Sequence, residues 1–201
     1  MNKRKKIKDI NFGIRYNYRV TRADISSKEA KDLYDKIEWL FSNGFSEKAS
    51  ELLNKLNKTF GEVVALDHNI VPNTGLTVLA KAISGNATGL DALEIKYGAV
   101  GTGTGTAVLG DTTLGTEQFR KVDSSLTYKE NKAYVTMLYS ATDFTTTGIG
   151  NIKEHGLFID GTTGADSGSL WSRLLLNSPT GISKTNLQSL TIDYEVEFKN
   201  A

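Results

Sequence analysis

Apolar residues recur at helical spacing before Leu90 and mostly at every second position after it. In the first part, residues 26–43 and 46–60 each carry an apolar stripe along one side of a predicted helix. Ser26 and Glu29 fit a capping box at the start of the first helix. Because the connection is short, the two helices should fold back on each other as an antiparallel hairpin. The stripes consist of Ala30, Leu33, Ile37, Leu40 and Phe41, and of Ala49, Leu52, Leu53, Leu56 and Phe60.

A hairpin of two short helices cannot bury both apolar stripes by itself. We expect the stripes to rest on the β-rich part of the chain, with another subunit or a partner protein as the alternatives. Pro72 then breaks the chain, and a shorter helix is predicted over residues 74–84.

Beyond Leu90 the chain is rich in Gly, Thr and Ser, and turn-prone runs separate several short alternating segments. The last segment alternates most strictly, with apolar residues on one face and acids on the other, as in an antiparallel sheet with one buried face. We therefore predict an α+β protein in which an N-terminal helical hairpin is followed by an antiparallel, jelly-roll-like β-sandwich. Strands are expected near 93–100, 116–127, 132–140, 149–159, 169–176 and 187–199.

Residues 10–20 also alternate, which predicts a strand or an extended arm. We divide the chain into a basic arm at 1–22, a helical hairpin at 23–62, a linker with a short helix at 63–89 and a β-sandwich at 90–201.

Charge is spread unevenly over the 201 residues. Residues 1–22 hold eight basic residues and one acid, Asp9, or +7; the whole chain is +1, so the remainder carries −6. Such a basic arm is typical of an anchor to a negative partner, and a solvated terminus is the alternative. The expected docking residues are Lys3, Arg4, Lys5, Lys6, Lys8, Arg15 and Arg19.

The absence of cysteine excludes disulfides, thiolate metal sites and cysteine nucleophiles. No apolar run approaches the length of a membrane span, and no apolar segment of a signal peptide follows the basic start.

The Gly-Thr run at 101–106 lacks the spacing of a dinucleotide or Walker loop, so an interstrand loop is the better interpretation. His68 and His155 fall on different elements without catalytic partners. The segment 160–166 resembles a calcium loop but lacks its ligand density, and a hairpin turn is favoured. Three acids, Asp143, Glu154 and Asp193, show no pattern that ranks them above solvated surface groups.

Residues 70–199 resemble a β-rich module of tailed-phage virion proteins, found in head-decoration, head-fibre and tail-fibre proteins. The likeness is carried by five pieces in a fixed order: 73–76, 95–103, 109–117, 152–158 with 170–173, and the closing strand 190–198. The resemblance implies a sandwich that serves as a structural building block and is commonly oligomeric. We expect no enzymatic activity, no cofactor or metal, and a closed homo-oligomer such as a trimer.

The leading hypothesis is therefore a virion component, assembled in the host cytoplasm, whose partners are other capsid or tail proteins and further copies of itself. A short chain with a basic arm favours the head over the tail, and we expect neither membrane nor specific nucleic-acid binding. The alternatives are a carbohydrate-binding β-sandwich that uses an aromatic such as Tyr97 or Trp171, and a hydrolase built on scattered carboxylates.

Overall fold

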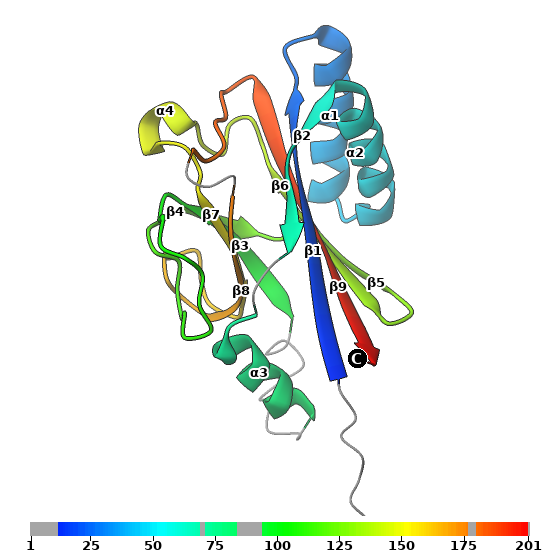
Figure 1. Ribbon diagram of the computed structural model, residues 1–201. Helices are drawn as coiled ribbons and strands as arrows, with labels where there is room; N and C mark the ends of the chain where they lie inside the picture. The colour runs from blue at the N-terminus through cyan, green and yellow to red at the C-terminus, as the bar shows by residue number, and fades with distance from the viewer. Residues whose placement is uncertain (1–11, 69–70, 84–93, 177–179, 201) are drawn as a thin grey trace, which may run out of the picture.

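Two antiparallel sheets packed face to face form the body of the protein (Figure 1). The computed structural model describes residues 12–68, 71–83, 94–176 and 180–200. The first sheet has the order β2 (Gly61–His68), β1 (Phe12–Asp24), β9 (Gln188–Asn200), β6 (Lys132–Tyr139), β5 (Ser125–Lys129). The second has the order β4 (Glu117–Val122), β3 (Ile95–Gly101), β7 (Glu154–Ile159), β8 (Ser169–Leu175).

The main core lies between the inner faces of the two sheets. In β9, Leu190, Ile192, Tyr194 and Val196 are buried in this core, as the strict alternation of that segment predicted. The acids between them lie on the outer face of the first sheet, where β9 is flanked by β1 and β6. The predicted α+β class with an antiparallel β-sandwich is thereby confirmed.

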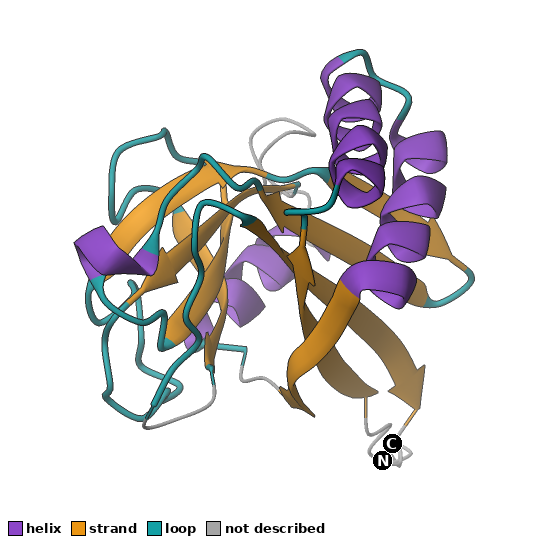
Figure 2. Cartoon of the chain, turned by 90° about the horizontal axis from the view of Figure 1, so that it is seen from above, coloured by secondary structure: helices purple, strands orange, loops and turns teal. Residues whose placement is uncertain are grey.

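The helical hairpin consists of α1 (Lys28–Ser42) and α2 (Ser46–Phe60), which lie side by side against the sheet that contains β1 (Figures 1 and 2). It is an insertion between β1 and β2, and its apolar stripes pack on residues of the sandwich such as Ala23 and Leu138. The stripes therefore rest on the β part of the chain. The N-cap of α1 is Ser27, whose Oγ accepts from the Ala30 N–H at 3.2 Å, and not Ser26 as expected.

Residues 12–22, which we assigned to a separate basic arm, form most of β1. This strand pairs with β9 along its whole length and with β2 on its other side, so it is an interior strand of the first sheet. Tyr18 and Val20 point into the main core. The alternation of the segment was recognised, but its partner lies at the far end of the sequence, where local pattern gives no information.

Three further elements differ from the expectations. The strand expected at 116–127 is two strands, because the chain crosses from one sheet to the other at Asp123-Ser124. The start of the expected linker, Gly61–His68, is the edge strand β2. A short helix that was not expected, α4 (Thr146–Ile149), precedes β7. The predicted third helix is present as α3 (Asn73–Ile83), which packs on β8.

Candidate functional site: two loops clamped on one face of the sandwich

The outer face of the second sheet carries two long loops. Residues 102–116 connect β3 to β4, and residues 160–168 connect β7 to β8. A small apolar cluster lies beneath them, in which Leu114 from the first loop packs with Ala99, Phe158 and Leu170 of the sheet. Each loop is also tied down by a buried ion pair.

The first ion pair joins Glu154 of β7 to Arg173 of β8, whose Nε donates to Glu154 Oε2 at 2.9 Å. Glu154 is fully buried, and its two carboxylate oxygens also accept the backbone N–H groups of Gly103, Gly115 and Thr116 at 2.8–2.9 Å. A buried carboxylate is stable only when paired and hydrogen-bonded, and this one meets both conditions. We call Glu154, Arg173 and these three N–H groups the Glu154 clamp.

Arg173 extends the clamp toward the tip of the loop. Its Nη1 donates to Asp111 Oδ2 at 2.8 Å and its Nη2 to the carbonyl of Gly105 at 3.1 Å. The Asp111 carboxylate in turn accepts from the Val108 N–H at 2.9 Å. One guanidinium therefore connects two β-strands to two points of the loop.

The clamp explains two of the three glycines in the Gly-Thr run, Gly101 and Gly103. A Cβ on Gly103 would lie 2.3 Å from Glu154 Oε1, and one on Gly101 would lie 2.5 Å from the carbonyl oxygen of Thr116. The backbone N–H groups that a phosphate loop would offer to an anion are here bound to the protein's own carboxylate. The interpretation as an interstrand loop is confirmed, and its conformation is set by Glu154.

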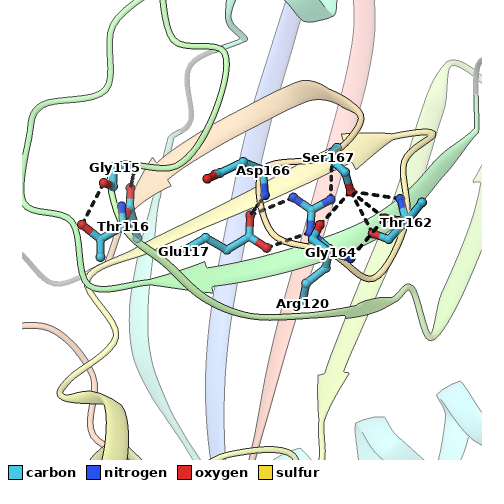
Figure 3. A network of polar contacts seen from close by, with 9 residues as sticks. Gly115, Thr116, Glu117, Arg120, Thr162, Gly164, Asp166 and Ser167 are labelled. Atoms are coloured by element: carbon cyan, nitrogen blue, oxygen red, sulfur yellow. Dashed lines mark hydrogen bonds and ion pairs between the residues drawn. The ribbon is translucent and has the colours of Figure 1, made fainter.

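The second ion pair, shown in Figure 3, joins Glu117 and Arg120 of β4 through two hydrogen bonds of 2.7 Å. Both side chains are buried, and the guanidinium also lies 4.0 Å above the ring of Phe158. Arg120 donates to the carbonyl of Ser167 at 2.7 Å, and Glu117 accepts from the Asp166 N–H at 3.2 Å. Residues 115–117 belong to both networks, so the two loops are connected through this short segment.

The segment considered as a calcium loop is the turn that this second pair holds. Asp160 and Asp166 are both exposed and both have φ near +55°. The Ser167 hydroxyl fills the inside of the turn, accepting from the Thr162 N–H at 3.0 Å and donating to the Gly164 carbonyl at 2.7 Å. Among the described residues, no group of three His, Asp or Glu side chains gathers as a metal site would require.

The remaining candidate residues lie apart from one another. His155 is buried in the main core between Tyr139 and Tyr194, and burial lowers its pKa to about 3. Asp143 pairs with Lys121 at 2.7 Å, while Asp193 accepts from Thr136 at 2.8 Å on the outer face of the other sheet. His68 belongs to β2, where its side chain is outside the described part. In the described part of the chain, these acids and histidines do not converge in one cleft.

Glu154 is the residue that the sequence interpretation placed least well, since it was grouped with solvated surface acids. Every residue of β7 is buried, so the strand lacks the alternation that separates an inner face from an outer one. Asp111 and Arg173 appeared only within pieces of the phage resemblance. Three of the five pieces, 95–103, 109–117 and 152–158 with 170–173, each supply at least one residue to the Glu154 clamp or its extension.

The expected docking residues separate into two groups. Lys3, Arg4, Lys5, Lys6 and Lys8 lie outside the described residues. Arg15 and Arg19 lie in β1, in register with Glu197 and Asp193 of β9. Burial raises the pKa of Asp193, and the charge of Arg19 partly opposes this rise. Part of the positive charge of the N-terminal region is therefore balanced within the sheet.

An apolar cavity of about 460 Å³ opens between the sheets beside α3. Ile95, Trp171, Val196 and Phe198 contribute to its walls, and Tyr128 lies at it with 85% of its surface exposed. Trp171 is only 7% exposed, and Tyr97 is half-buried with the Arg120 guanidinium 5.8 Å from its ring. Of the two aromatics named for carbohydrate binding, Trp171 is thus buried and Tyr97 is partly exposed.

Comparisons with known proteins give no relative: no family model, curated protein or solved structure matches the chain. Within the described residues, none of the helices is both long and apolar enough to span a bilayer.

Proposed function

We propose that the protein is a non-enzymatic structural component of a tailed-phage virion, a head-decoration or head-fibre protein or a tail-fibre or collar protein. One observation carries the proposal: three of the five sequence pieces that resemble the virion module come together in space in the Glu154 clamp and its extension to Asp111. Much of the resemblance therefore lies in residues that hold one surface of the sandwich in a fixed conformation. A particle component needs such a fixed contact surface and requires no reaction centre.

The ionisable residues support the same proposal. Glu154, Arg173, Glu117 and Arg120 use their charges on each other and on backbone groups of the two loops. Such positions hold structure in place, whereas a general acid or base must reach a substrate. The carbohydrate-binding alternative receives less support, because Trp171 is buried and Tyr97 is only partly exposed.

The position of β1 reduces the number of basic residues that we assign to docking. Because Arg15 and Arg19 lie in register with the acids Glu197 and Asp193 of β9, the basic residues that we assign to docking on another virion protein are Lys3, Arg4, Lys5, Lys6 and Lys8.

The virion role is tested by purifying phage particles from the cells that produce the chain. Mass spectrometry and immunogold electron microscopy then identify the proteins of the particles. We expect the chain on the particle in a fixed stoichiometry to the major capsid or tail protein. A chain found only in the soluble lysate contradicts the virion role.

The docking segment is tested by changing all five basic residues of 3–8 to Gln and measuring incorporation into particles. The matched control changes five exposed lysines of the helical hairpin, which alters the net charge equally: Lys28, Lys36, Lys48, Lys55 and Lys58. We expect the first variant to fold but to be lost from particles, and the control to be incorporated. Equal incorporation of both variants contradicts docking through this segment and leaves the virion role standing.

A further inference from the structure

Three of the four edge strands of the two sheets are irregular. The register of β2 against β1 skips Val64, and that of β4 against β3 skips Gln118. The register of β8 against β7 also shifts, and α3 packs on β8. Such bulges and covering helices are common means by which proteins prevent an edge strand from pairing with a further strand.

The fourth edge strand, β5, is regular and open (Figure 1). It pairs with β6 in an unbroken register, and within the described residues no strand pairs with its other edge. Leu126 and Tyr128 of β5 are 37% and 85% exposed, and both lie at the apolar cavity between the sheets. Their partners in β6, Val135 and Ala133, pack in the main core, so the pair lies on the inner face of the sheet. An open backbone edge therefore lies beside the mouth of an apolar cavity.

The sequence of β5 is suited to pairing with itself. In an antiparallel two-fold contact, the register that pairs all of Ser125–Lys129 places Thr127 opposite Thr127 of the second copy. Leu126 then lies opposite Tyr128, and Ser125 lies opposite Lys129. An aliphatic and an aromatic side chain form a favourable cross-strand pair, and like charges do not face each other in this register.

A second copy matches the backbone edge and the cavity together. Its β5 supplies hydrogen-bond partners along the open edge, whereas a small apolar molecule in the cavity would leave that edge unpaired. Its Leu126 and Tyr128 continue the inner face of the sheet across the mouth of the cavity. Self-complementarity is what an isologous contact requires, and it gives no advantage to an unrelated partner.

From the unbroken edge, the apolar pair at the cavity and the self-complementary register together, we propose that two copies of this chain associate by pairing β5 with β5. The two five-stranded sheets then join into one continuous sheet. A two-fold contact of this kind gives a dimer, whereas the sequence alone suggested a closed oligomer such as a trimer. The proposal is independent of a virion role, because it concerns the purified chain.

The register is tested with single cysteines, because the chain has none of its own. In the proposed contact the Cα atoms of the two Thr127 residues lie about 4.5–5.5 Å apart, within the range that a disulfide requires. Those of the two Lys129 residues are separated by about 14 Å, since they lie four strand positions apart. We expect Thr127→Cys to form a disulfide-linked dimer under mild oxidation and Lys129→Cys, which is also exposed, to remain unlinked on non-reducing electrophoresis.

The contact itself is tested by Tyr128→Lys in the full chain, with Val63→Lys as the matched control. Val63 is also exposed, by 59%, but lies on the edge strand β2. Light scattering and sedimentation over a concentration series measure the mass. We expect the unmodified chain to dimerise, Tyr128→Lys to weaken dimerisation roughly tenfold or more, and Val63→Lys to leave it unchanged.

Circular dichroism checks that each variant is folded, and the milder Tyr128→Ser must also weaken dimerisation. An unmodified chain that stays monomeric overturns the proposal, including the case in which the edge or the cavity binds something else. A trimer, equal losses in both Lys variants, or cross-linking of Lys129→Cys as complete as that of Thr127→Cys overturns it as well.

Discussion

At the scale of single residues, the chain uses its buried charges to fix backbone. Glu154 bonds to three backbone N–H groups and to Arg173, while Glu62 at the surface pairs with Arg22 across β1 and β2. The surface pair gains little, because water screens both charges and Glu62 is 61% exposed. Loss of the Glu154 charge instead leaves the buried Arg173 with Asp111 as its one acidic partner and takes a charged acceptor from three backbone N–H groups.

We therefore expect Glu154→Gln to lower the free energy of unfolding by about 3–5 kcal/mol, the usual cost of breaking a buried ion pair. The control Glu62→Gln should cost less than about 1 kcal/mol. Urea denaturation followed by circular dichroism measures both. Equal losses in the two variants would show that the Glu154 clamp contributes no more than a surface pair.

His155 makes the stability depend on pH. Its Nε2 lies 2.7 Å from the Tyr139 hydroxyl and its Nδ1 is hydrogen-bonded to the Tyr194 hydroxyl, a pattern that a neutral ring satisfies with one donor and one acceptor. Burial lowers the pKa of His155 from 6.5 to about 3. Between these values the unfolded chain binds a proton that the folded chain does not, so the folded state loses stability as the pH falls.

We expect this single group to contribute a loss of up to about 1.4 kcal/mol for each pH unit between pH 6.5 and about 3. His155→Gln removes the titrating group, so its free energy of unfolding should fall less steeply than that of the unmodified chain over that range. Urea denaturation at a series of pH values gives the two slopes. Parallel profiles would mean that His155 is protonated at a similar pH in both states.

At the scale of elements, the sequence pattern predicted whether a segment forms a helix or a strand. It predicted less well which strands pair with each other. The helices over 28–42 and 46–60 and the strand β9 follow from local spacing and were recognised. The position of β1 depends on β9, at the other end of the sequence, and that of β2 depends on β1. Local alternation cannot specify such distant pairing, because it fixes a face and leaves the neighbour open.

The same limit applies to the candidate site. Glu154 and Arg173 are 19 positions apart and Arg173 and Asp111 are 62 apart, so no motif spacing joins them. Both faces of β7 are covered, which leaves Glu154 without the polar alternation that would have marked it as special. The glycines at 101 and 103 were visible, but their reason, a carboxylate pressed against the backbone, required the fold.

The interior position of β1 gives a prediction for truncation. Removal of residues 1–22 takes away most of a strand that pairs on both sides, together with Tyr18 and Val20 of the core, so we expect the product not to fold. Removal of residues 1–8 should leave the cooperative unfolding transition unchanged. Circular dichroism and thermal unfolding compare the two. A folded product lacking residues 1–22 would show that β1 is dispensable to the sheet.

At the scale of the whole molecule, the outer surfaces of the two sheets differ in kind. The hairpin of α1 and α2 packs on the outer side of the first sheet, and two clamped loops cover the second (Figures 1 and 2). On the loop side, the first loop exposes Val108 and Leu109 and the second exposes Asp160 and Asp166. The two loops share the segment 115–117, because Glu154 bonds to Gly115 and Thr116 while Glu117 belongs to the second ion pair. A change in one clamp should therefore reach the other loop.

A double-mutant cycle measures this connection. Glu154→Gln and Glu117→Gln each release one side of the shared segment, so the second change should cost less once the first is present, with a coupling free energy of about 0.5–3 kcal/mol. The control pairs Glu154→Gln with Ser27→Ala, which removes the N-cap of α1 in the other layer and should be additive within about 0.5 kcal/mol. Urea unfolding of the single and double variants provides every term. Additive losses for Glu154 and Glu117 would mean that each loop is held independently, and that the face acts as two separate surfaces.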